Sequence, residues 1–345
     1  YKEHTNTHLS LHYQDSNNAS AERHSPFSQN NKLWALLDGQ IYNLDSVRAG
    51  FTGHVQQADG TGTADVILAL YQAHGSTFLE KLRGRFALMI IDQVANTVVL
   101  YRSSLGQVPL YYHASSERII ASSEERAIVA HPAVGIDANV LMLASVFSLN
   151  SSHPVGQTAF TQVSELLPGE CLVWTKGVIE QWRTPLSLGL STISYRSDQE
   201  YADHYRNILE RMVSRCLFES GKVGVMLSSG IDSAPAAAIA AKQLKRSGRI
   251  LTAYSWSLAG FDTADESRQI QQVADFANIP LQLIPAIDRW PLYNRDNLHI
   301  TANSPLSNAF QGLKDTVLEA AAYDGCEIIL NGWFGDRLFM FNQRL

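Results

Sequence analysis

The second half of the chain alternates between short apolar runs and longer amphipathic stretches, and this alternation is the strongest constraint on its fold. The amphipathic stretches have the three- and four-residue spacing of helices, and the apolar runs are short enough for buried strands. Strands separated by helices are typically parallel, because a parallel connection must cross back along the sheet. We expect strands over residues 222–227, 250–257, 281–284 and 327–331, and helices over residues 199–218, 234–245, 265–277 and 308–323.

The first half follows a different pattern, in which pairs of apolar runs are joined by short turns. The density of these pairs predicts an antiparallel α+β domain. The Ser-rich residues 185–196 have neither periodicity, so we expect a linker there between one domain over residues 1–185 and another over residues 197–345. In the first domain we expect hairpins over residues 86–101, 110–122 and 171–182, a helix over residues 64–74, and a strand over residues 33–37 that ends at a turn at Asp38-Gly39.

Composition excludes several classes of protein. With 27 Lys and Arg against 33 Asp and Glu, the net charge of −6 argues against a nucleic-acid binder. No run reaches the length of a membrane span, and residues 140–149 are better interpreted as a core helix. The first thirty residues lack the order of a secretory signal. Three widely spaced cysteines, Cys171, Cys216 and Cys326, indicate reduced, buried thiols and a cytoplasmic protein.

A loop of small residues joins the predicted strand over residues 222–227 to the helix that follows. Serine and glycine let backbone amides wrap around an anion, and a helix N-terminus adds N–H groups and partial positive charge. Phosphate would repel Asp232 in this loop unless a divalent cation lay between them, so Asp232 is interpreted as a Mg²⁺ ligand. The alternative is a Ser-rich turn in which Asp232 or Ser233 caps the helix.

A second loop, over residues 331–337, also follows a predicted strand and also contains glycine and a carboxylate, Asp336. Two parallel strands that end in such loops place both at the carboxyl edge of the sheet, where α/β folds bind ligands. Asp232 and Asp336 are then positioned to share metal ions that bridge a nucleotide triphosphate. The alternative for Asp336 is a turn or helix-capping carboxylate.

These motifs resemble those of the asparagine synthetase family. Residues 228–233 resemble its pyrophosphate loop, Ser-Gly-Gly-x-Asp-Ser, and residues 332–339 its Gly-x-Gly-x-Asp-Glu-x-Phe segment. In the first half, residues 38–43, 82–87 and 105–112 are similar to Asn-Gly-Glu-Ile-Tyr-Asn, Leu-x-Gly-x-Phe-Ala and Leu-Gly-x-x-Pro-Leu-Tyr-Tyr. The resemblance implies an N-terminal αββα sandwich of the glutaminase (Ntn-hydrolase) type, followed by a parallel α/β domain of the ATP-pyrophosphatase (PP-loop) type.

The resemblance also implies ATP and Mg²⁺ as cofactors. Asp232 and Asp336 are the implied catalytic metal ligands. The positions that would hold pyrophosphate are Ser228, Ser229, Gly230, Asp232 and Ser233. The positions that would enclose adenine and ribose are Leu227, Trp256, Asn331 and Gly332. Glu266 matches a recurrent acid of the family, to which the sequence assigns no role.

The first domain departs from a working glutaminase. The family uses an N-terminal cysteine, whereas this chain begins with Tyr1, has no cysteine before Cys171 and starts late relative to the family. Loss of the carboxylates that bind the charged amine of glutamine removes the specificity of the pocket. We expect a degenerate domain with a structural role. The substituted pocket positions are Asp38, Gln40, Thr63 and Ser103.

The second domain departs where the family handles ammonia. Trp333 stands where asparagine synthetases have a glutamate, Arg337 replaces another, and Phe334 and Ser229 replace glycines. This pattern resembles the intramolecular branch of the family, the lasso-peptide macrolactam synthetases and β-lactam synthetases. There ATP activates a carboxylate as an acyl-adenylate, pyrophosphate leaves, and an amine of the same substrate closes the ring.

The expected function is therefore ATP-dependent amide-bond formation, with a lasso-type peptide preferred over a β-lactam precursor as substrate. A partner peptidase that exposes the peptide amine is implied. Asparagine synthetase activity and a catalytically silent scaffold are the alternatives. At 345 residues the chain is short for the family. We expect truncation at both ends, with the residues that act on the attacking amine in a missing C-terminal region.

Overall fold

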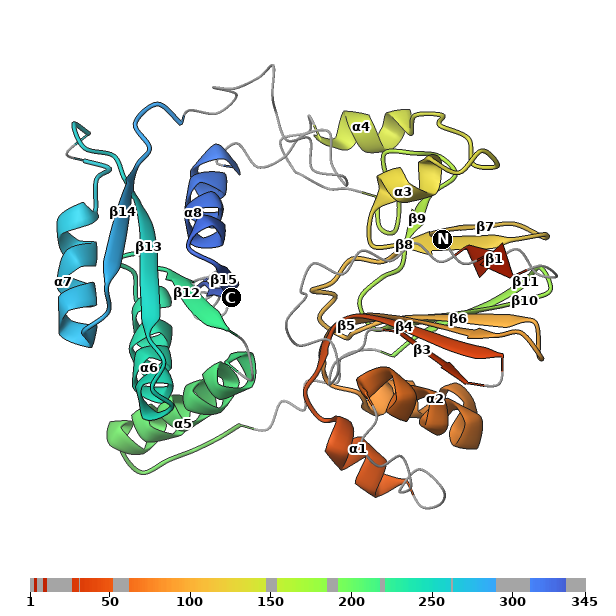
Figure 1. Ribbon diagram of the computed structural model, residues 1–345, viewed down its shortest axis with the longest axis horizontal. Helices are drawn as coiled ribbons and strands as arrows, with labels where there is room; N and C mark the ends of the chain where they lie inside the picture. The colour runs from red at the N-terminus through yellow and green to blue at the C-terminus, as the bar shows by residue number, and fades with distance from the viewer. Residues whose placement is uncertain are drawn as a thin grey trace. The chain divides into compact units, whose positions relative to one another are not determined.

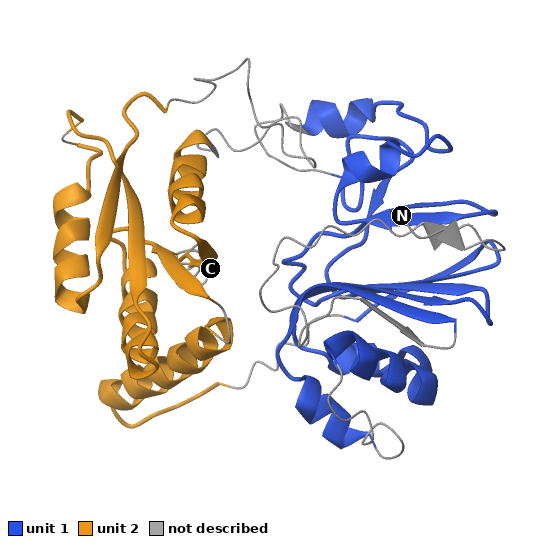
Figure 2. Cartoon of the chain, in the orientation of Figure 1, with its two compact units in different colours: residues 1–189, 301–305 blue, residues 190–300, 306–345 orange. Residues whose placement is uncertain are grey.

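The computed structural model describes residues 3–4, 9–10, 27–30, 32–51, 62–146, 154–184, 192–217, 221–261, 263–289 and 311–332. The chain divides into two compact units, residues 1–189 with 301–305 and residues 190–300 with 306–345 (Figure 2). Unit 1 has antiparallel sheets and unit 2 has a parallel sheet. The mixed α/β class that the two sequence patterns predict is confirmed.

Unit 1 is built on a six-stranded antiparallel sheet of order β11-β10-β6-β5-β4-β3 and a three-stranded sheet of order β8-β7-β9. The strands are β1 (Glu3–His4), β2 (Leu9–Ser10), β3 (Phe27–Asn30), β4 (Leu33–Ile41), β5 (Gly84–Asp92), β6 (Thr97–Arg102), β7 (Tyr111–Ala114), β8 (Ile119–Ser122), β9 (Ser164–Glu165), β10 (Glu170–Thr175) and β11 (Val178–Arg183). The helices are α1 (Leu44–Gly50), α2 (Thr63–His74), the 3-10 helix η2 (Gly75–Lys81), α3 (Glu125–Val129) and α4 (Val140–Val146). The predicted helix and all three hairpins are present.

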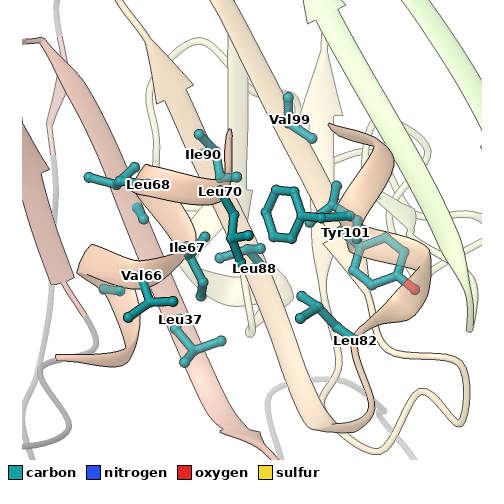
Figure 3. Packing of buried hydrophobic residues seen from close by; sticks show 14 of the residues in the cluster. Leu37, Val66, Ile67, Leu68, Leu70, Leu82, Leu88, Ile90, Val99 and Tyr101 are labelled. Carbon is teal, nitrogen blue, oxygen red and sulfur yellow. The ribbon is translucent and has the colours of Figure 1, made fainter. Parts of the chain in front are cut away.

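Alternate residues of β5 face two different cores, as expected when a sheet is covered on both sides. Leu88 and Ile90 pack against Ile67 and other residues of α2 (Figure 3). Ala87 and Met89 face the core between the two sheets. A smaller cluster, with Ile128 of α3, Tyr111 of β7 and Ile120 of β8, covers the three-stranded sheet. Unit 1 is therefore layered helix, sheet, sheet, helix.

The turn predicted at Asp38-Gly39 is wrong, because β4 continues through it to Ile41. Asp38 pairs with Ala87, and Gly39 pairs with Phe86. Gly39 has φ +96°, and a Cβ there would collide with the carbonyl oxygen of Arg85. Glycine is needed here because it allows a positive φ and a close approach between two strands. Turns use glycine for the same freedom, so an Asp-Gly pair alone does not distinguish a turn from a strand.

The predictions of a core helix over residues 140–149 and of three buried thiols need correction. The helix α4 ends at Val146, and Val140 and Leu141 are 72% and 74% exposed, so α4 is not a core element. All three cysteines are free thiols. Cys171 is buried, whereas Cys216 and Cys326 are only half-buried. Among the described residues, no helix is long and apolar enough to span a membrane.

Unit 2 is a four-stranded parallel sheet of order β14-β13-β12-β15. Its strands are β12 (Lys222–Met226), β13 (Leu251–Ser257), β14 (Leu281–Pro285) and β15 (Cys326–Leu330), and its helices are α5 (Asp198–Cys216), α6 (Ser233–Arg246), α7 (Ser267–Ala277) and α8 (Gln311–Tyr323). All eight elements predicted for the second domain are confirmed, with ends shifted by a few residues.

The direction of the strand order reverses at β12. From β12 the chain adds β13 and then β14 on one side, and it returns to add β15 on the other side. Residues of α5, α6 and α7 pack on one face of the sheet, and residues of α8 pack on the opposite face (Figure 1). In doubly wound sheets, ligands bind at such a reversal, outside the carboxyl ends of the strands. The carboxyl ends of β12 and β15 are therefore the expected position of a ligand site.

Glu125, the first residue of α3, gives unit 1 a pH-dependent stability. Its side chain is 3% exposed, and burial, aided by Glu165, raises its pKa from 4.5 to about 7. Because the folded-state pKa is raised, the carboxyl group is neutral at low pH, and stability falls as pH rises from about 4.5 to about 7. Glu125→Gln should therefore stabilise the protein by about 1–2 kcal/mol more at pH 8 than at pH 5, measured by urea unfolding.

The control is Glu124→Gln, which neutralises the exposed neighbouring carboxyl group. It should leave the difference between the two pH values unchanged. An equal gain for Glu125→Gln at pH 5 and pH 8 would contradict the assignment of this pH dependence to Glu125.

Candidate functional site

The loop after β12 is shaped by two of its own serines. β12 ends at Met226, the buried Leu227 follows it, and α6 begins at Ser233. The backbone N–H of Ser228 donates to Oγ of Ser233 over 3.1 Å, and the two hydroxyl oxygens lie 2.8 Å apart. The N–H of Gly230 donates to Oγ of Ser228 over 3.2 Å. These bonds close the loop into a compact turn, while Ser228, Ser229 and Gly230 remain exposed.

Asp232 lies directly before α6 with a right-handed helical backbone (φ −86°, ψ −46°), and its side chain makes no hydrogen bond to the end of the helix. The hydroxyl of Ser233 is bonded back to Ser228. The interpretation of Asp232 or Ser233 as the side-chain cap of α6 is therefore wrong. A half-buried carboxylate that does not cap its helix is suited to binding a cation.

The loop after β15 meets the loop after β12, as the sequence predicts. The two strands pair in parallel, with Val225 opposite Leu330. The backbone of Gly332 lies against the start of α6, where an added Cβ would be 2.6 Å from the nitrogen of Ser233 and 2.8 Å from the carbonyl carbon of Asp232. No side chain fits there, so the two loops are in direct backbone contact. Trp333, Phe334, Asp336 and Arg337 lie outside the described residues.

A third segment, between β13 and α7, joins this cluster. Oδ1 of Asp265 accepts hydrogen bonds from the hydroxyl of Ser267 over 2.6 Å and from the N–H of Leu258 over 3.0 Å, and these bonds lower the pKa of Asp265. The next residue, Glu266, accepts a hydrogen bond on Oε2 from the hydroxyl of Ser229 over 2.7 Å. The sequence shows both acids but not this contact, which is made by side chains 37 positions apart.

The structure separates the residues predicted around adenine and ribose. Leu227 is 1% exposed and packs in the core on the α6 face, so only its backbone is available to a ligand. The side chain of Trp256 is half-buried in the cluster on the α8 face. Asn331 is exposed and leads into Gly332 beside the start of α6. Leu227 thus begins the loop after β12 with a buried side chain, and Gly332, which follows Asn331, contacts the end of that loop at the start of α6.

No group of three or more His, Cys, Asp or Glu within the described ranges is arranged as a metal site. Mg²⁺ is often bound by one or two carboxylates, with water and phosphate oxygens completing its shell. Asp232 fits such a role, because it lies beside exposed serines and at the start of a helix. The described residues therefore suit a polyphosphate with its cation, and not a metal ion held by protein ligands alone.

In unit 1, polar side chains at Ser103 and beside Thr63, two of the substituted pocket positions, accept hydrogen bonds from the backbone. Oδ2 of Asp65 accepts a hydrogen bond from the N–H of Gly62 over 2.9 Å at the start of α2, where Thr63 is the first helical residue. Ser103 is buried, and its hydroxyl accepts from the N–H of Phe86 over 3.3 Å. These side chains stabilise the start of a helix and a strand end.

Comparison with known proteins agrees with this two-part construction. The family model described as glutamine amidotransferase domain matches residues 3–183, just over half of the chain, and the model described as asparagine synthase matches residues 204–340. These matches define a chain with an amidotransferase-type domain followed by an asparagine synthase-type domain. The chain belongs to the asparagine synthetase family.

Its relatives are distant. Asparagine synthetase [glutamine-hydrolyzing] 3 of Bacillus subtilis (strain 168) is 26% identical over 62% of this chain and 34% of its own length. Amidase chyE of Penicillium rubens is 25% identical over 93% of this chain and 49% of its own length. Among solved structures, the glutamine phosphoribosylpyrophosphate amidotransferase from B. subtilis covers 88% of this chain and 72% of its own, with 14% identity and a TM-score of only 0.30. The chain thus spans between a third and a half of the length of these two curated relatives.

The contact between Gly332 and the start of α6 predicts a large effect of one methyl group. Gly332→Ala should destabilise unit 2 by about 1–3 kcal/mol, because the groups that would have to move are backbone. Urea unfolding measures the change. The matched variant Gly230→Ala adds its methyl only 3.2 Å from the movable hydroxyl of Ser228 and should cost less than about 0.5 kcal/mol. Equal losses in the two variants would show that the loops do not pack this tightly.

Proposed function

We propose that the protein is an ATP-dependent carbon–nitrogen ligase that forms an amide bond with release of AMP and pyrophosphate. The observation that carries this proposal is the backbone contact between Gly332 and the start of α6. It joins the loops after β12 and β15 at the point where the strand order reverses. This is the place where doubly wound sheets bind nucleotides.

In this proposal the loop after β12 holds the pyrophosphate part of ATP. The exposed serines and the first amides of α6 bind phosphate oxygens, because they combine donors with the positive end of the helix. Asp232, with Asp336, binds Mg²⁺. ATP supplies the activation of a carboxylate as an acyl-adenylate. The proposed phosphate-binding positions are Ser228, Ser229, Gly230 and Ser233.

The adenosine part is assigned to the carboxyl ends of β13 and β15. The exposed Asn331 and the backbone of Gly332 adjoin the loop, and Trp256 offers an aromatic surface near the end of β13. Leu227 contributes through its backbone, because its side chain is in the core. These assignments follow the family positions, and the burial of Leu227 refines them.

For the acceptor we propose an amine on the same substrate, in a macrolactam closure of a lasso-type peptide. The support is in the sequence: Trp333 and Arg337 stand where asparagine synthetases have glutamates. The hydrogen bonds of unit 1 also favour an acceptor other than ammonia from glutamine. Asp65 accepts a hydrogen bond at the start of α2, and Ser103 accepts one from a strand, so both side chains bind the backbone. Tethering of the amine raises its effective concentration to about 10⁵ M or more. A separate peptidase would expose that amine.

Asparagine synthetase activity is the second candidate, because two relatives of this chain are asparagine synthetases. Both asparagine synthetases, numbers 2 and 3 of B. subtilis, match this chain over 63% and 62% of its residues. The two candidates share the nucleotide site and differ in the acceptor. β-Lactam formation is the third candidate, which uses the same site and differs from macrolactam closure in the size of the ring.

Asp232→Asn tests the nucleotide site. It removes the negative charge that binds the cation and keeps the size of the side chain. We expect binding of Mg-ATP to weaken at least about tenfold, measured by titration calorimetry, and ATP–pyrophosphate exchange to fall more than about 100-fold. The control is Asp275→Asn, at an exposed position in the last turn of α7. Unchanged binding and exchange in Asp232→Asn would contradict the assigned role.

Product analysis separates the candidate acceptors. With a lasso-type precursor peptide, Mg-ATP and the partner peptidase, the macrolactam proposal predicts a product that has lost one water, measured by mass spectrometry. Asparagine formed from aspartate, ATP and ammonium would instead establish the second candidate. Failure to bind Mg-ATP, with no exchange on any of these carboxylates, would contradict the ligase proposal and leave a scaffold.

A further inference from the structure

The side chains of Ser229 and Glu266 connect the loop after β12 to the segment before α7. The hydroxyl of Ser229 donates to Oε2 of Glu266 over 2.7 Å, and both residues are exposed. The family motif has glycine at the serine position, and a glycine has no hydroxyl to donate. Ser229 is absent from the described residues with positive φ, so the loop accommodates a side chain there without backbone strain.

The carboxylate of Glu266 accepts one hydrogen bond from the loop after β12, and the residue before it is held by bonds of its own. On its own segment, Asp265 is fixed by Ser267 and Leu258. Glu266 is the residue before the first turn of α7, yet its side chain makes no hydrogen bond to that helix. It reaches across to the loop after β12 instead. A negative charge is therefore fixed beside the loop assigned to pyrophosphate.

The formal charges of residues 227–233 and of Glu266 are all negative. Residues 227–233 contain one carboxylate, Asp232, and no lysine or arginine. Among the described residues, none of the ion pairs involves Glu266 or Asp232. One carboxyl group, of Asp232, thus lies in a loop whose donors are amides and hydroxyls, and a second, of Glu266, contacts that loop. A polyphosphate without a cation would meet repulsion from both.

We infer that Glu266 is a specificity-determining residue that makes the loop prefer metal-bound over metal-free polyphosphate. The inference rests on the proposed function, because it concerns the same nucleotide site. Metal-free ATP carries about four negative charges at neutral pH and Mg-ATP about two, so a fixed carboxylate penalises the metal-free form more. Asp232 binds the cation, and Glu266 excludes the ligand that lacks it.

Two variants separate the charge of Glu266 from its hydrogen bond. Glu266→Gln keeps an acceptor for Ser229 and removes the charge. It should strengthen binding of metal-free pyrophosphate and metal-free ATP by about fivefold to tenfold, and change binding of their Mg²⁺ forms by less than about twofold. Ser229→Ala keeps the charge and removes the bond. Ser229→Ala should weaken the binding of the metal-free and of the Mg²⁺-bound ligands by a similar factor of about two to five.

The measurement is titration calorimetry of the purified chain with pyrophosphate and with ATP, each in excess MgCl₂ and in EDTA. Circular dichroism checks that each variant is folded, and Glu266→Ala supplies a second removal of the charge with the same expected direction. The control is Glu319→Gln, an exposed carboxyl group on α8. It should leave the ratio of the two affinities unchanged.

Three results would overturn the inference. Weaker binding of the Mg²⁺ forms by Glu266→Gln, with metal-free binding unchanged, would make Glu266 a metal ligand. An equal change in the affinity of Glu266→Gln for the metal-free and the Mg²⁺-bound ligands would give Glu266 a purely structural role in the loop. No binding of either probe by the unmodified chain, with or without Mg²⁺, would remove the proposed function as well. Only this last result affects both proposals.

Discussion

The parallel pairing of β15 with β12 is the interaction on which the candidate site depends. A strand added beyond β14 would have placed Asn331 and Gly332 at the far edge of the sheet. The return of the chain across the other face, with α8 packed on Tyr254, places them beside the start of α6 instead. Gly224 in β12 assists this arrangement, because a side chain there would collide with the ring of Tyr254. The sheet is thus tightly packed below the edge where the loops meet.

Unit 1 uses its polar groups differently. Arg102 is buried and donates to Glu165 and to three backbone carbonyl groups, which ties together segments that are far apart in the sequence. A buried guanidinium needs this set of partners, because an unpaired buried charge is strongly destabilising. Asp65 and Ser103 likewise bind backbone N–H groups. The chain has kept the layered fold of an amidotransferase domain and employs these polar side chains to stabilise it.

The sequence predicts unit 2 well, because its elements follow from periodicity and its loops follow from the direction of the strands. It predicts contacts between side chains poorly. The Asp38-Gly39 pair is misread as a turn, since glycine serves equally where two strands approach closely. The burial of Leu227 was predictable in principle, because Val223 and Val225 set a period of two that carries it into the core. The bond from Ser229 to Glu266 was not, because it depends on the spacing between the segments that follow β12 and β13.

The charge of the site sets how this chain can contribute to catalysis. The loop after β12 has no lysine or arginine to neutralise a polyphosphate, and in the proposed site a cation bound through Asp232 supplies counter-charge. The amides at the start of α6 and the serine hydroxyls then supply orientation more than charge. A site of this kind gains most from a substrate whose reacting groups are already joined, because positioning alone lowers the barrier to ring closure. The electrostatics of the loop and the proposed intramolecular acceptor therefore point to the same division of labour: the cation offsets the phosphate charge, and the protein positions the reacting groups.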